Sequence, residues 1–155
     1  MKGLLVKFGF ALLLSSVMFS ACEKELKRVE RNTYPNGNPK IVIYYDGEET
    51  QEDMAIMELY HQNGQVKTKK RYEDGLQHGL TESWYADGSP WSEANYDEGK
   101  KVGDYIHKYQ NQVIKQKGHF TDGKKDGEWI NFSNKGDTTS IEIWNMGQRK
   151  KIKRF

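Results

Sequence analysis

The chain has 155 residues, of which 30% are charged and 35% hydrophobic, and its formal net charge is +2. This length favours a single domain, although the first residues do not belong to it. A nucleic-acid-binding domain would normally show a strong basic excess, and the near balance of acidic and basic residues argues against such a partner.

The N-terminal segment has the features of a secretory signal. Lys2 and Lys7 precede an almost unbroken apolar run from Phe8 to Ala21, which ends in small residues. This run is shorter than the ~20 residues that a membrane-spanning helix needs. A charged start, a short apolar run and a small-residue site are typical of a cleaved signal, so residues 1–21 are predicted to be removed. The remaining chain would carry 22 basic and 22 acidic residues.

The only cysteine, Cys22, directly follows Phe19-Ser-Ala. This stretch resembles the bacterial lipobox, whose cysteine becomes the acylated N-terminus after cleavage, with Phe19 replacing the usual leucine. The resemblance implies a lipoprotein of the bacterial cell envelope, anchored in the outer membrane through Cys22 and facing the periplasm or the outside. The alternative is a secreted protein with one unpaired thiol. Residues 22–33 are highly charged and are predicted to be a tether, with a short amphipathic helix as the alternative.

A unit of 24 residues recurs in the rest of the chain. An aromatic residue lies three positions before the first glycine of each unit, at Tyr72, Tyr96, Phe120 and Trp144. These aromatic residues and the glycines that follow them share one period, which indicates a repeat protein. The glycines expected to serve as structural turn residues are Gly75, Gly79, Gly99, Gly103, Gly123, Gly127 and Gly147.

The segments between these glycines are predicted to be strands. Asn-Gly and Asp-Gly pairs supply the positive φ of tight hairpin turns, and the segments between them are rich in Tyr, Trp, Val, Ile and Thr. We therefore predict an all-β domain over residues 34–155, an elongated antiparallel meander of stacked hairpins in a single-layer sheet. About nine or ten strands are expected. Alternation predicts a packed face and an opposite basic stripe, the stripe comprising Lys67, Lys69, Arg71, Lys115, Lys117 and His119.

The paired glycines carry a resemblance to a known family. Gly75-Leu-Gln-His-Gly79, Gly99-Lys-Lys-Val-Gly103 and Gly123-Lys-Lys-Asp-Gly127 resemble MORN repeats, and more closely the MORN-variant repeats of bacterial proteins. Many such proteins are catalogued as the antitoxin component of a toxin–antitoxin module. The resemblance extends from Tyr34 to Trp144. It implies an elongated sheet of hairpins that scaffolds or binds, and it brings no catalytic residues.

No recognisable pattern of catalysis or metal binding is found. The four histidines, His61, His78, His107 and His119, lack the spacing of a zinc helix and a cysteine partner. The Asp-Gly pairs lack the ligand spacing of a calcium loop, and no serine lies in a nucleophile elbow. We therefore predict a protein that is not an enzyme, without cofactor or metal.

Three functions are compatible with these observations. The first is a protein- or glycan-binding scaffold, whose candidate binding surface consists of Trp84, Trp91, Tyr105, Tyr109 and Trp129. These residues could instead pack against neighbouring repeats. The second is an antitoxin or immunity protein that neutralises a cognate toxin, which rests on the resemblance alone. The third is lipid binding through the basic stripe and the basic end, residues 149–155. The lysines of that end have a competing explanation, which is that they protect an open sheet edge against aggregation.

Overall fold

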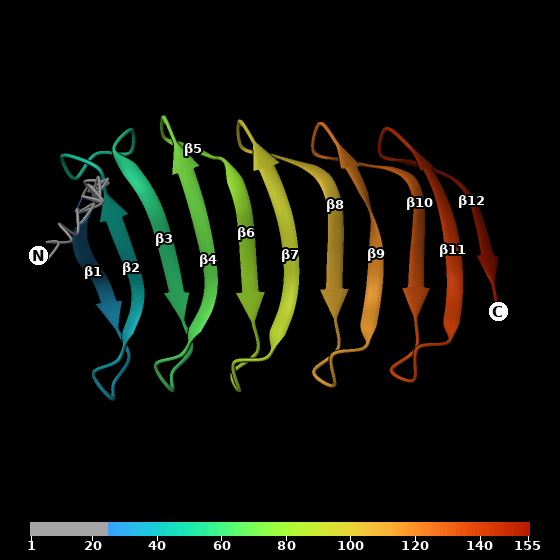
Figure 1. Cartoon of the computed structure of the whole chain (residues 1–155), viewed down its shortest axis with the longest axis horizontal. Helices are drawn as coiled ribbons and strands as arrows, with labels where there is room; N and C mark the ends of the chain where they lie inside the picture. Colours follow the sequence, from blue (N-terminus) through green and yellow to red (C-terminus); the bar gives the residue numbers. More distant parts are fainter. Residues whose placement is uncertain (1–24) are drawn as a thin grey trace, which may run out of the picture.

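A computed structural model of the chain describes residues 25–155. These residues form a single open antiparallel sheet and contain no helix, as the all-β hairpin meander predicted from the sequence requires (Figure 1). The strands are β1 (Lys27–Thr33), β2 (Pro39–Tyr45), β3 (Met54–Tyr60), β4 (Val66–Glu73), β5 (Leu76–Gln77), β6 (Gly79–Trp84), β7 (Pro90–Asp97), β8 (Lys100–Lys108), β9 (Ile114–Thr121), β10 (Lys124–Phe132), β11 (Thr138–Asn145) and β12 (Gln148–Arg154). They lie in chain order, except that the short β5 pairs only with β4.

The repeat domain begins earlier than the sequence predicts. Residues 27–33, which we expected in a tether, form β1 and pair with β2, so the tether prediction is wrong for this part. A charged segment can form this strand because β1 is an edge strand, in which Val29 alone is half-buried. Charged side chains also discourage pairing with other chains at such an edge. Together with β5 and β12, β1 brings the number of strands to 12, which exceeds the nine or ten expected from the sequence. Residues 1–21 and Cys22 lie outside the described residues.

The first glycine of each unit forms a hairpin turn at the upper edge in Figure 1. At Gly123 the φ angle is 77°, and Asp122 before it also has a positive φ of 50°. Two consecutive positive φ angles define the type I′ turn, which matches the twist of paired strands. The second glycines, Gly79, Gly103 and Gly127, also have positive φ, but they lie in strands β6, β8 and β10 and not in hairpin turns.

Neighbouring repeats are linked by a side chain at the lower edge of the sheet. This side chain lies three residues before the turn glycine or its equivalent, and it donates a hydrogen bond to a backbone carbonyl of the next repeat. The bonds run from Tyr34 Oη to Tyr60 O (3.0 Å), from His61 Nε2 to Trp84 O (2.9 Å), from Tyr85 Oη to Lys108 O (2.8 Å) and from Tyr109 Oη to Phe132 O (3.0 Å). Each repeat is thus held by its neighbours.

One face of the sheet, here called the aromatic face, carries most of the packing. Its centre is Trp129, whose side chain is 0% exposed. The rings of Tyr105 and Phe120 lie 5.6 Å and 4.9 Å from the Trp129 ring, and Gly118 lies directly beneath the indole. The absence of a side chain at Gly118 provides the space into which Trp129 packs.

The opposite face does not carry the predicted basic stripe. Lys69 lies 3.5 Å from the buried Glu58, and Arg71 lies 3.2 Å from Glu82, so both cations are paired with acidic residues of neighbouring strands. Lys115 packs instead over the ring of Tyr109, with its Nζ 5.4 Å from the ring centroid. The prediction fails at Lys115 because an extra residue shifts the β8–β9 register between His107 and Lys108, which interrupts simple alternation.

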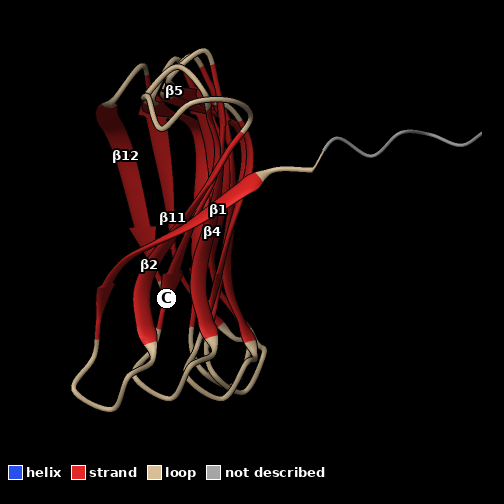
Figure 2. Ribbon diagram, turned by 90° about the vertical axis from the view of Figure 1, so that its left-hand side faces the viewer, coloured by secondary structure: helices blue, strands red, loops and turns tan. Residues whose placement is uncertain are grey.

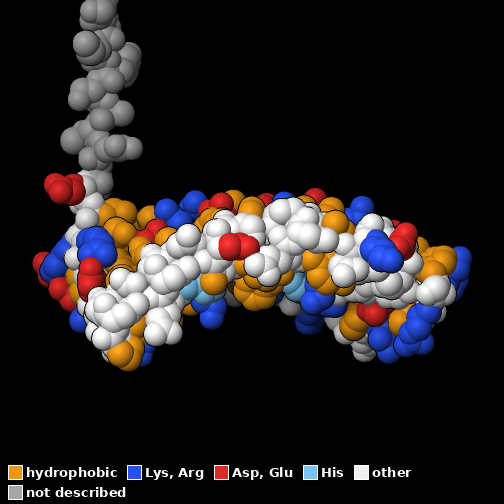
Figure 3. Space-filling model, turned by 90° about the horizontal axis from the view of Figure 1, so that it is seen from below, with side chains coloured by type: hydrophobic (Ala, Val, Ile, Leu, Met, Phe, Trp, Pro, Cys, Tyr) orange, Lys and Arg blue, Asp and Glu red, His pale blue; other side chains and the backbone are white. Residues whose placement is uncertain are grey.

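The sheet is elongated, twisted and bowed. Figure 2 shows the progressive twist of the strands, and Figure 3 shows the bowed outline along the row of lower turns. The first and last strands lie at opposite ends of the array (Figure 1). Residues 25–155 provide no helix that could cross a membrane.

Candidate functional site

The most apolar hollow of the sheet lies at its lower edge, where β6 turns into β7. It has a volume of about 320 Å³ and is lined by His61, Lys67, Trp84, Tyr85, Ala86 and Trp91. We call it the aromatic hollow. The Asp87-Gly88 turn brings Tyr85 and Trp91 together, with their ring centroids 6.3 Å apart. Lys67 is exposed and supplies a positive charge at the hollow.

Trp91 is held in place from the next strand. Its ring lies edge-on to His107, at 5.5 Å between centroids, and its Nε1–H donates a hydrogen bond of 2.5 Å to His107 Nε2. This bond requires Nε2 to be unprotonated. Burial lowers the pKa of His107, and the nearby Lys115 lowers it further, so that the imidazole stays neutral. The indole is therefore fixed between Tyr85 and His107 before any ligand arrives.

The five aromatic residues of the predicted binding surface have different roles. Trp84 and Trp91 line the aromatic hollow. Trp129 is fully buried, so its assignment to a binding surface is wrong, because its indole fills the space above Gly118. Tyr105 packs against it. Tyr109 is half-buried and lies under Lys115, and its hydroxyl links two repeats.

Sequence reasoning missed several residues of the hollow. His61 and Tyr85 occupy the repeated position three residues before the turn glycine, a regularity that was available in the sequence. Trp91 lies 24 residues after Lys67 and 24 before Lys115, so a tryptophan interrupts a series of lysines. The contact with His107 had no signal in the sequence, because it depends on the register between β7 and β8.

The bond between Trp91 and His107 predicts a pH dependence. The pKa of His107 is lower in the folded protein than the ~6.5 of an unfolded chain, so the unfolded state binds more protons between these two values. The contribution of His107 to the free energy of unfolding should be constant above about pH 7. It should fall as the pH drops below about 6.5, because the unfolded chain then gains a proton that the folded protein does not. The melting temperature from pH 7.5 to 5.5, followed by tryptophan fluorescence, measures this effect.

His107→Gln is the matched control, because a glutamine oxygen can accept the indole hydrogen bond and does not titrate. The variant should show a smaller loss of melting temperature over the same pH range. Equal losses in both proteins would assign the pH dependence to other groups.

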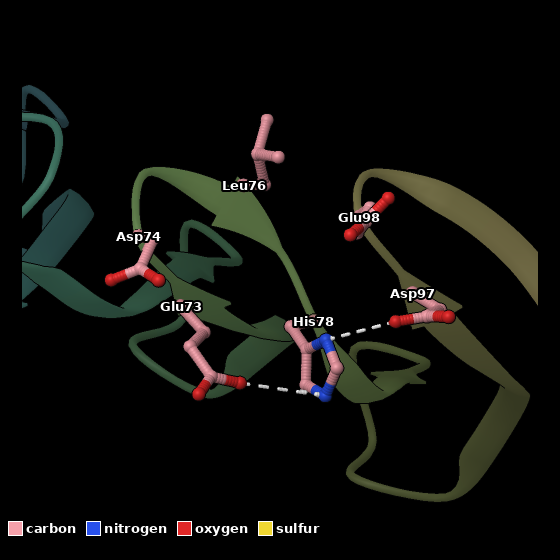
Figure 4. A pocket seen from close by; sticks show the side chains of 6 residues that line it. All are labelled: Glu73, Asp74, Leu76, His78, Asp97 and Glu98. Carbon is pink, nitrogen blue, oxygen red and sulfur yellow. Dashed lines mark ion pairs between the residues drawn. The ribbon is translucent and has the colours of Figure 1, made fainter.

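A second hollow, of about 200 Å³, lies at the upper edge between two neighbouring repeats. Figure 4 shows His78 between Glu73 and Asp97, whose carboxylates lie 3.5 Å and 3.3 Å from its ring nitrogens. Asp74 and Glu98 also line it. The group does not qualify as a metal site, since residues 25–155 hold no cluster of three or more His, Cys, Asp or Glu side chains that could bind an ion.

Charge is divided unevenly along the array. Residues 46–98 contain 13 acidic and 4 basic residues, whereas residues 99–155 contain 6 acidic and 13 basic residues. The middle of the array is therefore strongly acidic and its C-terminal end strongly basic, although the whole is nearly neutral. Such a field orients a charged partner along the long axis.

Comparison with known proteins supports the repeat type. Residues 55–74 and 77–98 match the family model described as "MORN repeat variant". Repeats of this type generally mediate interactions with proteins or membranes. A search of curated proteins gave no match.

Among solved structures, the chain is similar to a crystal structure of the GtfA/B complex bound to UDP and GlcNAc, with 12% identity and a TM-score of 0.39. The match covers 81% of this chain and 27% of that one. A crystal structure of TarM matches with 13% identity and a TM-score of 0.33, over 66% of this chain and 21% of that one. The chain thus spans about a quarter of the length of these proteins.

Proposed function

We propose that the protein is a non-catalytic lipoprotein of the bacterial cell envelope, anchored through Cys22, whose repeat sheet binds another protein or a glycan. The observation that carries this proposal is the aromatic hollow. Large aromatic residues in a preformed hollow with a polar rim are typical of the centres of binding interfaces. Trp91 meets this description, because Tyr85 and His107 hold its ring and Lys67 lies nearby.

The anchor follows from the sequence of the first 22 residues. The first described strand lies at one end of the array, so an anchor at Cys22 would hold the sheet by that end. The aromatic hollow, formed by the β4, β6 and β7 region, would then lie several strands away from the membrane. This arrangement leaves both faces of the sheet accessible to a partner.

Binding through the hollow is tested with the double variant Trp84→Ala/Trp91→Ala. The full-length protein serves as bait in envelope extracts, and capture is compared at equal loading with that by the single variant Phe155→Ala, which removes an exposed aromatic residue at the far end of the array. Loss of a central aromatic anchor costs at least about 2 kcal/mol, or roughly 30-fold in affinity. A partner should therefore be lost with the double variant and kept with Phe155→Ala. Equal capture by all three proteins would exclude the hollow as the binding site.

The anchor is tested by Cys22→Ser. The variant should lose acyl labelling and should leave the membrane fraction after a carbonate wash, because a multiply acylated cysteine is the stable attachment. The wild-type protein should remain in the membrane fraction. A variant that still sediments with the membrane would place the attachment elsewhere.

Neutralisation of a cognate toxin is the second candidate, and the acidic upper edge favours it. Glu73, Asp74, Asp97 and Glu98 line one hollow there and would attract a cationic partner. In that case capture should depend on Glu73→Gln/Asp97→Gln, not on the two tryptophans, and the captured protein should be encoded next to this gene. A partner lost only with the tryptophans argues against this candidate.

A further inference from the structure

A second regular feature of the aromatic face is a column of cations near its upper edge. Lys101, Lys125 and Arg149 lie 24 residues apart. Each pairs across strands with the repeated aromatic residue of its unit, in the pairs Tyr96–Lys101, Phe120–Lys125 and Trp144–Arg149. In the preceding repeat the position opposite Tyr72 is the neutral Gln77. The cation column therefore occupies only the C-terminal half of the sheet.

The two lysines of the column are embedded among aromatic rings. Lys101 Nζ lies 5.3 Å from the centroid of Tyr105 and 5.1 Å from that of Phe120. Lys125 Nζ lies 4.0 Å from the centroid of Trp129 and 5.0 Å from that of Trp144. These contacts fix the positions of the ammonium groups.

Neither lysine of the column forms an ion pair with a carboxylate of residues 25–155. Burial lowers the pKa of both side chains, although the nearby Glu142 carboxylate acts in the opposite direction on the pKa of Lys125. Glu142 is the one carboxylate among the paired residues of this face, and it lies 3.7 Å from Arg149. The column thus holds three cations beside a single carboxylate, and Lys101 is partly desolvated without a counter-ion. Such cations are placed to bind an anion, since an incoming negative group stabilises the charged form that burial disfavours.

We propose that the cation column is a binding site for a linear acidic polysaccharide that lies across the strands and carries one carboxylate per disaccharide. Successive members of the column are two strands apart, about 9.6 Å at ~4.8 Å per strand, which is comparable to the length of a disaccharide. The half-buried rings of Phe120 and Trp144 lie on the strands between the cations, and that of Tyr105 lies beside Lys101. These rings offer apolar surface to the CH faces of sugar rings.

A membrane surface fits this column less well than a polymer. The neighbouring turns at the upper edge carry the exposed carboxylates of Asp97, Glu98 and Asp122. A flat anionic membrane that approached this edge would meet these carboxylates. A single polymer chain lying on the face would pass beside them, and its regular charges would match a regular column.

The test uses full-length protein in nonionic detergent and hyaluronan oligosaccharides, which carry one carboxylate per disaccharide, measured by titration calorimetry. Lys101→Met/Lys125→Met keeps the apolar stems and removes both charges, and it should bind at least about tenfold more weakly. The control Lys108→Met/Lys135→Met removes two charges outside the column and should stay within about twofold of wild type. Lys101→Arg/Lys125→Arg should retain binding. Arg149→Gln, at an exposed position, should weaken binding on its own.

Three results would overturn the proposal. Equal affinities of the column variant and its control would show that the lysines serve only to pack the aromatic rings. No binding of hyaluronan to the wild-type protein would exclude this class of ligand. Column-dependent binding to phosphatidylglycerol vesicles, with none to the polysaccharide, would assign the site to lipid. The Trp84→Ala/Trp91→Ala variant should bind hyaluronan normally, because the aromatic hollow lies at the opposite edge.

Discussion

Replacing Trp129 with alanine should lower the free energy of unfolding by about 3–5 kcal/mol, the usual cost of removing a large buried aromatic side chain. The residue is 0% exposed, and it is packed between Tyr105, Phe120 and Lys125 above Gly118. A single-layer sheet has few such sites, so the loss is a large share of the ~5–15 kcal/mol that stabilises a typical domain. Urea denaturation followed by circular dichroism measures it.

Phe155→Ala provides the comparison for Trp129→Ala. Phe155 is 65% exposed and lies at the end of the array, so its removal should change the free energy of unfolding by less than about 0.5 kcal/mol. If the two variants unfold at similar urea concentrations, the centre of the packing lies elsewhere.

Gly118→Ala is expected to be the other strongly destabilising change, with a cost of about 3 kcal/mol. An added Cβ would lie 2.2 Å and 2.4 Å from two atoms of the Trp129 indole, far inside contact distance. The backbone at Gly118 is not in the left-handed region, so this cost would be steric and not conformational. Lys117→Ala, at the adjacent exposed position, should have little effect.

The two changes should also be coupled. In the Trp129→Ala background the space above Gly118 is free, and Gly118→Ala should then cost at least about 1 kcal/mol less than in the wild-type protein. An additive double variant would show that the methyl group clashes with something other than the indole.

The fold could be predicted from the sequence because its turns have a specific chemistry. Asp122-Gly123 and its counterparts require positive φ, and their 24-residue spacing leaves room only for hairpins. The strand β1 could not be predicted in the same way. Its sequence is mostly charged, and it is a strand because β2 offers a free edge, a condition that lies outside the segment itself.

The candidate site was only partly predictable. An aromatic residue on a sheet can pack or bind, and the choice depends on its neighbour across the strand. Trp129 is buried because Gly118 lies beneath it, whereas Trp91 lines an open hollow and is held by His107. Lys115 reaches the aromatic face because of a register shift, and alternation counted along one strand cannot reveal such a shift.

The hydrogen bonds from Tyr85 to Lys108 O and from Tyr109 to Phe132 O have a consequence for how such a protein can change in length. Each bond ends on a backbone carbonyl, so the next repeat needs no particular side chain to receive it. Duplication or deletion of a whole 24-residue unit would therefore preserve the junctions on both sides. Each such event would move every later surface by about 9.6 Å, two strand spacings of ~4.8 Å, relative to the N-terminus. The number of units thus acts as a ruler that sets the distance between the first strand and the surfaces beyond it.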